Sequence, residues 1–347
     1  MNVKRYFLHC YNHHLIDAVR DIFNVADLAH KNDQVEISIY PESADLENFP
    51  EKGTKIIDAL KDICQKNNWP LSKFKIITAN PLQKEVWPFT EFRSSWPAFL
   101  SLTDYEIKDI SISDQCKKFG CYVCNSSWPR LWISSYLFNT HVNDTDQTFL
   151  RSPSTPAHAI NFDLDSLVFN FSSQKMIADL KLDEIANFIS NCPITHPKDV
   201  RDIEEPHPSS VDQKKEAITG NIMSFYDEIF VDLVCESYFS GKVFYLTEKT
   251  ARPLIAGRPF LIIGPVNFLS NLRKLGFRTF NKYWSEDYDW LSGPARLVAI
   301  SKIVDQIAKW SDQELMKVFE DMKPDLCHNQ LIYKNLTSDK INAVFNS

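Results

Sequence analysis

The chain has 347 residues, of which 44% are hydrophobic and 13% aromatic, and its formal net charge is -7. This composition excludes an intrinsically disordered chain and provides enough apolar residues for two domains of ordinary size. A negative net charge argues against a dedicated nucleic-acid binder, which usually carries a basic excess. No apolar run approaches the roughly 18 residues of a membrane span, and no signal-peptide core is found, which predicts a soluble protein of the reducing cytoplasm.

The first third of the chain alternates between strand-like and helix-like patterns. Apolar runs and alternation predict strands at residues 6–10, 35–40 and 74–77. Apolar residues spaced for one helix face predict helices at residues 15–23 and 56–63. Residues 80–115 contain Pro81, Pro88 and Pro97, so we expect them to be irregular. The order strand, helix, strand, helix, strand is typical of a parallel sheet covered by helices.

The second part of the chain repeats this alternation. Strands are predicted from residue 119 onward and at residues 229–235 and 259–263. Helices are predicted at residues 131–138, 174–190, 247–257, 268–274 and 294–322, with the last ending before Pro324. The stretch 140–160 is polar. Residues 193–220 are rich in Pro, His and charged residues and are interpreted as a loop, with a role as a mobile lid left open.

These patterns together predict an α/β protein with two Rossmann-like domains facing a cleft. The expected domains are residues 1–117, on the acceptor side, and residues 118–347, which would bind the nucleotide. Ligands of open parallel sheets bind beyond the carboxyl ends of the strands. Candidate binding residues are therefore those that follow a predicted strand or begin the next helix.

The most informative stretch for chemistry follows the predicted strand 229–235. Glu236 ends that strand, and Thr247 is a good N-cap for the next helix. Glu248 and Lys249 then lie in the first helical turn, whose free N–H groups favour phosphate, and Arg252 comes one turn later. Cations and N–H groups that face a departing nucleoside diphosphate would stabilise its growing negative charge. A carboxylate such as Glu236 could bind sugar or ribose hydroxyls.

This stretch resembles the donor-binding motif of the α-1,3-fucosyltransferases. The matching runs are CES at 235–237, YLTEK at 245–249 and PFLIIG at 259–264. Residues 247–260 are also similar to glycosyltransferase-like proteins of viruses and phages, and residues 275–280 and 286–289 belong to the same resemblance. The resemblance implies a GT-B-type architecture and an inverting transfer of sugar from a nucleotide-sugar donor, with a GDP-sugar favoured.

A second match lies upstream, at residues 122–130. There the resemblance implies that Asn125 and Arg130 bind the donor, with Arg130 reaching its phosphates. The likeness is specific over about 35 residues, moderate from residue 119 onward and weak over residues 1–115. Cys235 and Ser237 depart from the family pattern, so the donor need not be GDP-fucose.

An inverting transfer also needs a general base near the acceptor hydroxyl. The family places this group in the first domain, where the match is weakest. Glu91 is the candidate here, against the interpretation that it is a surface glutamate on an irregular loop. His13 and His14 could line the acceptor cleft but are better interpreted as polar loop residues.

Metal use is not expected. Asp144 with Asp146, and Asp163 with Asp165, match the Asp-x-Asp pattern of metal-dependent transferases, but such short matches are frequent in a chain with 45 acidic residues. Cys121 and Cys124 form a CxxC without a second pair at zinc-ligand spacing, which favours buried thiols. No cofactor is required by this interpretation beyond the nucleotide-sugar donor.

The predicted function is therefore a glycosyltransferase that acts on a glycan or another hydroxyl acceptor. One alternative is a phage-type transferase that decorates modified bases in DNA, which would make nucleic acid the acceptor. The other alternative is a non-catalytic carbohydrate- or partner-binding module on the same fold. An intact phosphate-binding set favours the enzyme over the module.

Overall fold

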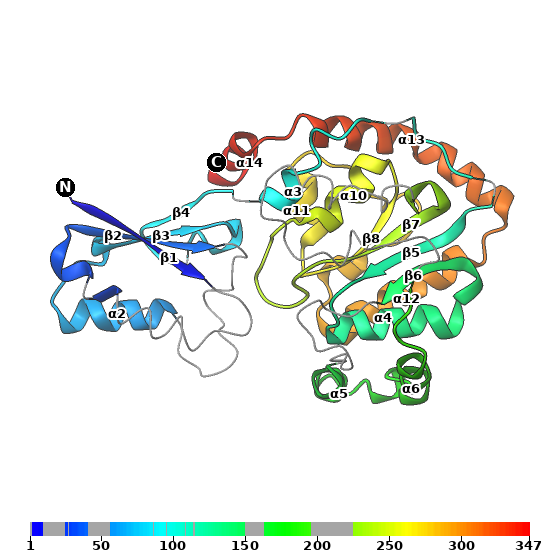
Figure 1. Ribbon diagram of the computed structural model, residues 1–347, viewed down its shortest axis with the longest axis horizontal. Coiled ribbons are helices and arrows are strands. Elements are labelled where there is room, and N and C mark those ends of the chain that lie inside the picture. Colours follow the sequence, from blue (N-terminus) through cyan, green and yellow to red (C-terminus); the bar gives the residue numbers. More distant parts are fainter. Residues whose placement is uncertain are drawn as a thin grey trace. The chain divides into compact units, whose positions relative to one another are not determined.

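The computed structural model describes residues 2–9, 25–26, 28–40, 56–85, 87–94, 96–107, 109–113, 115–149, 163–195 and 225–347. The chain divides into two compact units (Figure 1). The first comprises Met1–Pro97, Ser240–Tyr245 and Thr337–Ser347, and the second comprises Ala98–Phe239 and Leu246–Leu336. Each unit holds one parallel sheet, which confirms the α/β class. A domain boundary between residues 117 and 118, and a cleft between GT-B-type domains, stay predictions.

The sheet of the first unit has four parallel strands in the order β1-β2-β3-β4. Helices in the described part of this unit include α2 and the carboxyl-terminal α14, and residues 28–31 are also helical. The bounds are β1 Val3–His9, β2 Gln34–Tyr40, β3 Phe74–Thr78, β4 Thr90–Phe92, α2 Ile56–Lys66 and α14 Ser338–Asn346.

The core of the first unit lies between this sheet and α2. Alternate residues of β2 and β3 point to the same face, because side chains in a strand alternate between its two faces. The strand residues that face the core are fully or almost fully buried, namely Val35, Ile37, Phe74 and Ile76. They belong to the same buried cluster as Ile57, Leu60 and Ile63 of α2. The intervening residues Glu36 and Lys75 are only partly buried and lie on the opposite face. The predicted strands 35–40 and 74–77 and the helix 56–63 are confirmed.

The sheet of the second unit has the order β6-β5-β7-β8, also parallel throughout. The strands are β5 Lys117–Val123, β6 Thr145–Phe149, β7 Ile229–Cys235 and β8 Phe260–Ile263. The helices from the unit boundary onward are α3 Pro97–Leu100, α4 Trp128–Thr140, α5 Leu164–Ser173, α6 Leu182–Ser190, α10 Glu248–Ala256, α11 Phe268–Lys274, α12 Gly293–Ala308 and α13 Asp312–Lys334. Every residue of the central strand β7 and of the edge strand β8 is buried, as expected for a parallel sheet covered on both faces.

The connections in this sheet change direction between β5 and β7. The chain passes from β5 through α4 to β6 on one side, and from β7 through α10 to β8 on the other. Because such crossovers are right-handed, the two helices lie on opposite faces of the sheet, as Figure 1 shows. The carboxyl ends of β5 and β7 therefore form a topological switch point, the usual ligand position in this class of sheet.

Helix α10 begins and ends where the sequence predicts. The Thr247 hydroxyl accepts a hydrogen bond of 3.3 Å from the Lys249 amide, as an N-cap does. Gly257 ends the helix with a left-handed φ of 63°. A Cβ at Gly257 would lie 2.6 Å from Cγ1 of Ile110, so both the backbone and the neighbouring side chain require glycine.

Within residues 140–190 one strand was not predicted and one helix prediction is wrong. The polar stretch contains β6, whose residues Thr145, Gln147 and Thr148 are buried despite being polar. The single helix predicted at 174–190 begins only at Leu182, and the separate helix α5 ends at Ser173. Lys175 and Lys181 between them have positive φ values of 58° and 49°, which a continuous helix does not permit.

The prediction that the last long helix ends before Pro324 is also wrong. Helix α13 continues through this proline to Lys334. Its buried face extends to both sides of Pro324, with Phe319 and Met322 before it and Leu326 and Tyr333 after it. Continued burial of this face outweighs the hydrogen bond that proline removes.

Several expectations fall partly or wholly outside the described residues. These are the helix at residues 15–23, His13 and His14, and the loop from residue 196 to residue 220. Among the residues that are described, no helix combines the length and the apolar character that crossing a membrane requires.

Candidate functional site

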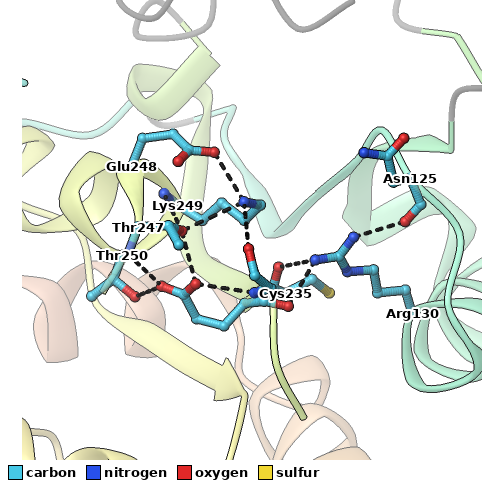
Figure 2. Close-up of polar contacts among 9 residues, drawn as sticks. Asn125, Arg130, Cys235, Thr247, Glu248, Lys249 and Thr250 are labelled. Carbon is cyan, nitrogen blue, oxygen red and sulfur yellow. Dashed lines mark hydrogen bonds and ion pairs between the residues drawn. The ribbon is translucent and has the colours of Figure 1, made fainter. Parts of the chain in front are cut away.

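The candidate site lies at the switch point of the second unit. Asn125 follows β5, Glu236 follows β7, and α10 begins at Glu248 directly after its cap (Figure 2). These three segments come from distant parts of the sequence. They meet because parallel strands place their carboxyl ends at one edge of the sheet.

Arg130 joins the two strand ends. Its Nη1 donates to the carbonyl of Asn125 at 2.8 Å, and its Nη2 donates to the carbonyls of Cys235 at 3.2 Å and Glu236 at 2.7 Å (Figure 2). The Nε atom of Arg130 is buried and has no hydrogen-bond partner. The terminal nitrogens thus serve the protein's own backbone, whereas the resemblance implied that they reach phosphates.

Glu236 is almost completely buried and accepts four hydrogen bonds. Its Oε1 accepts from the Thr247 amide at 3.3 Å and the Thr250 hydroxyl at 2.5 Å. Its Oε2 accepts from the Thr247 hydroxyl at 2.7 Å and the Ser237 amide at 3.1 Å. A carboxylate has about four lone-pair positions, so this arrangement leaves none for a sugar or ribose hydroxyl.

Lys249 and Glu248 lie in the first turn of α10. The ammonium of Lys249 is 2.9 Å from Oε1 of Glu248 and 3.5 Å from the hydroxyls of Ser237 and Thr247. Burial raises the pKa of Glu248, but the charges of Lys249 and Arg252 outweigh it and lower the pKa to about 2. Glu248 is therefore ionised at neutral pH, and Lys249 keeps 26% of its side chain exposed toward solvent.

Arg252 is the least satisfied charge of this site. The residue is only 9% exposed, and its Nε atom is buried without a hydrogen-bond partner. Within the described part of the chain, the guanidinium makes no hydrogen bond or close ion pair, although it acts electrostatically on Glu248 and Asp232. A buried charge without a bonded partner is costly, so this position is suited to an anionic ligand.

The thiol of Cys124 is affected by the charges of three cations of the site, Arg252, Lys249 and Arg130. Burial raises its pKa to about 11, while Arg252, Lys249 and Arg130 each lower it by their charge. All three cations therefore lie within electrostatic range of this one side chain. The thiol stays protonated at neutral pH, which makes Cys124 unsuited to act as a nucleophile.

Asp232 lies beneath this site, in the middle of β7. It is 3% exposed, and the hydroxyl of Tyr226 donates to its Oδ2 at 2.7 Å. Burial raises the pKa of Asp232 from 3.8 to about 7, although the Tyr226 hydrogen bond and the charge of Arg252 both lower it. Asp232 was not among the predicted site residues, although an acid inside the apolar run VDLVC is a recognisable signal.

Protein stability is expected to fall as the pH rises because of Asp232. Its pKa is higher in the folded than in the unfolded chain, so its contribution is fully present below pH 4 and is lost as the pH passes 7. Denaturant unfolding at pH 5 and pH 8 measures this change. Asp232→Asn resembles the protonated acid and should show a smaller decrease between the two pH values. Equal decreases in the two proteins would contradict the assignment.

Glu91, the candidate general base, lies on β4 of the first unit. Its carboxylate is 2.5 Å from Nζ of Lys75 and 2.5 Å from Nε of Arg93. The hydrogen bond from Arg93 and the contact with Lys75 lower the pKa of Glu91 despite partial burial. A general base works best with a pKa near the operating pH, so this ion-paired carboxylate is a weak candidate.

One acid of each pair that resembles a metal site is hydrogen-bonded within the protein. Asp146 accepts from the Tyr122 hydroxyl at 3.1 Å, and Asp163 accepts from the Trp128 amide at 3.1 Å. The described ranges contain no group of three or more His, Cys, Asp or Glu residues arranged to hold a metal. Independence from metal stays a prediction, because a substrate can also contribute ligands.

No protein-family model matches the chain, and no curated protein matches it. The resemblance to the α-1,3-fucosyltransferases therefore depends on the motif residues alone.

Proposed function

We propose that the second unit binds the diphosphate of a nucleotide sugar and that the protein transfers this sugar to a hydroxyl acceptor. The observation that supports the proposal most strongly is Arg252, a largely buried arginine whose Nε atom is buried with no hydrogen-bond partner among the described residues. Leaving this atom of a cation without a partner costs stability. Such a cost is expected where a ligand supplies the missing partner.

The surroundings of Arg252 favour a diphosphate. Lys249 adds a second cation, and the amino end of α10 adds the positive end of the helix dipole. A nucleoside diphosphate leaving group gains negative charge as the glycosidic bond breaks. Cations already in place at that position stabilise the transition state more than the ground state, which is the requirement for catalysis.

The proposal that the bound diphosphate belongs to a nucleotide sugar, and that this sugar is transferred, depends on the motif at residues 235–264. A GDP-sugar is the favoured donor, inversion at the anomeric carbon is the expected outcome, and the first domain would hold the acceptor. Lys249 and Arg252 are the proposed phosphate contacts. No general base is assigned, because Glu91 is already paired with Lys75 and Arg93.

The proposal predicts release of a nucleoside diphosphate from one nucleotide sugar. The purified protein is incubated with GDP-, UDP- and CMP-sugars, with and without a panel of glycans and DNA, and the released nucleotide is measured. Lys249→Ala should lower turnover by roughly 10- to 100-fold, as loss of a charged hydrogen bond of about 1.5–3 kcal/mol implies. Lys317→Ala, at an exposed position of α13, is the matched control and should leave turnover unchanged.

The acceptor panel separates this proposal from its alternatives. Stimulation by a glycan supports a glycan transferase, whereas stimulation by DNA alone supports a base-modifying enzyme. Binding of a nucleotide without release from any nucleotide sugar would favour a non-catalytic module. Turnover that is equal in wild type and Lys249→Ala would contradict the placement of the donor.

A further inference from the structure

Residue 236 is held from two sides at the switch point. Its carbonyl accepts a hydrogen bond of 2.7 Å from Arg130, which is itself bonded to the carbonyl of Asn125. Its side chain is bonded to the first turn of α10 through Thr247 and Thr250. A continuous set of hydrogen bonds therefore links the loop after β5, the end of β7 and the start of α10.

This set of bonds reaches the main chain of Lys249. The Thr247 hydroxyl donates to Oε2 of Glu236, which orients its lone pairs so that it accepts from the Lys249 amide at 3.3 Å. The Thr250 hydroxyl, one residue beyond Lys249, is bonded to the other oxygen of Glu236. Lys249 thus lies between two residues that the same carboxylate holds.

We propose that Glu236 is a positioning residue, whose carboxylate fixes the first turn of α10 so that Lys249 and Arg252 face a bound diphosphate, and which does not itself contact the ligand. This role rests on the proposed function of the site. It differs from a sugar-binding role because all four lone-pair positions of Glu236 accept bonds from Thr247, Thr250 and Ser237.

The direction in which Glu236→Gln changes the affinity for a diphosphate distinguishes a positioning role from a purely electrostatic one. Glu236→Gln removes a negative charge beside an anion site, which by charge alone would strengthen binding of a diphosphate. The amide nitrogen of glutamine, however, is a hydrogen-bond donor. It would face donors of Ser237, Thr247 or Thr250 that now bond to a carboxylate oxygen. Positioning therefore predicts weaker binding of GDP or UDP, by about tenfold.

Thr250 provides a test that leaves the charge unchanged. Thr250→Val keeps the shape but removes the hydroxyl bonded to Glu236, and it should weaken diphosphate binding in the same direction. Thr250→Ser restores the hydroxyl and should recover most of the affinity lost in Thr250→Val. If the two residues act through their hydrogen bond, the double variant Glu236→Gln/Thr250→Val should lose little more than Glu236→Gln alone.

The experiment is calorimetric titration of GDP and UDP into wild type and these variants, after denaturant unfolding has shown each to be folded. Hydrogen exchange of the Thr247 amide is measured in the same proteins without ligand, and Glu236→Gln should lower its protection. Equal or tighter binding by Glu236→Gln, or additive losses in the double variant, would overturn the positioning role and leave the proposed function intact. Absence of binding by wild type would overturn the proposed function and this role together.

Discussion

Replacing Arg252 by methionine is expected to stabilise the protein and to weaken its binding of nucleoside diphosphates. Arg252 is 9% exposed and its buried Nε is unpartnered, so the substitution removes a buried polar group that costs about 1–3 kcal/mol. Methionine fills much of the same volume with an apolar chain. The same substitution removes a charged contact to phosphate, which should lower affinity by roughly 10- to 100-fold.

Two measurements on the same protein test this prediction. Thermal unfolding without ligand should show a melting temperature about 2–4 °C higher per kcal/mol gained in a domain of this size. Titration with the preferred nucleoside diphosphate should show the loss of affinity. Arg278→Met is the control, because Arg278 is 49% exposed and pairs with Asp325. A variant that is both less stable and equally able to bind diphosphate would show that Arg252 has a structural role.

Asp289→Ala is expected to cause the largest loss of stability, about 3–5 kcal/mol. Asp289 and Arg296 are both completely buried, with Oδ1 of Asp289 3.4 Å from Nη2 of Arg296. The same carboxylate accepts from the amides of Leu269 and Ser270 at the start of α11. The substitution would leave an uncompensated buried guanidinium and two helix-terminal amides without their acceptor.

Denaturant unfolding of Asp289→Ala and Asp287→Ala measures this effect. Asp287 is exposed and bonded only locally to Ser285, so its removal should change the free energy of unfolding by no more than about 0.5 kcal/mol. A loss below about 1 kcal/mol for Asp289→Ala would contradict the account of this pair. Residues 286–289 are also part of the resemblance to the glycosyltransferases. A large loss for Asp289→Ala would give this run a structural role in holding α11 and α12.

The sequence predicts α10 and its surroundings well because local signals agree there. Thr247 is a cap, Gly257 is a glycine that the left-handed backbone requires, and the strands on either side are continuous apolar runs. Such signals act within a few residues and can be recognised without the fold. The same agreement allowed Lys249 and Arg252 to be placed on one helix, one turn apart.

The roles of Glu236 and Arg130 could not be predicted in this way. Their partners lie up to 106 positions away along the chain, and only the order β6-β5-β7-β8 brings the strand ends together. Strand β6 was missed because all of its buried residues except Phe149 are polar. The course of α13 through Pro324 was missed because the packing that outweighs the proline lies in other elements.

The diphosphate site is tested by calorimetric titration of the wild-type protein with GDP, UDP and CDP and with the corresponding nucleosides. We expect that at least one diphosphate binds with a stoichiometry of one, that its affinity falls as salt is raised, and that its nucleoside binds far more weakly. We also expect Arg252→Met to lose most of this affinity. Equal binding of nucleoside and diphosphate, or no binding of any diphosphate, would contradict the claim that Lys249, Arg252 and the amino end of α10 form a diphosphate site.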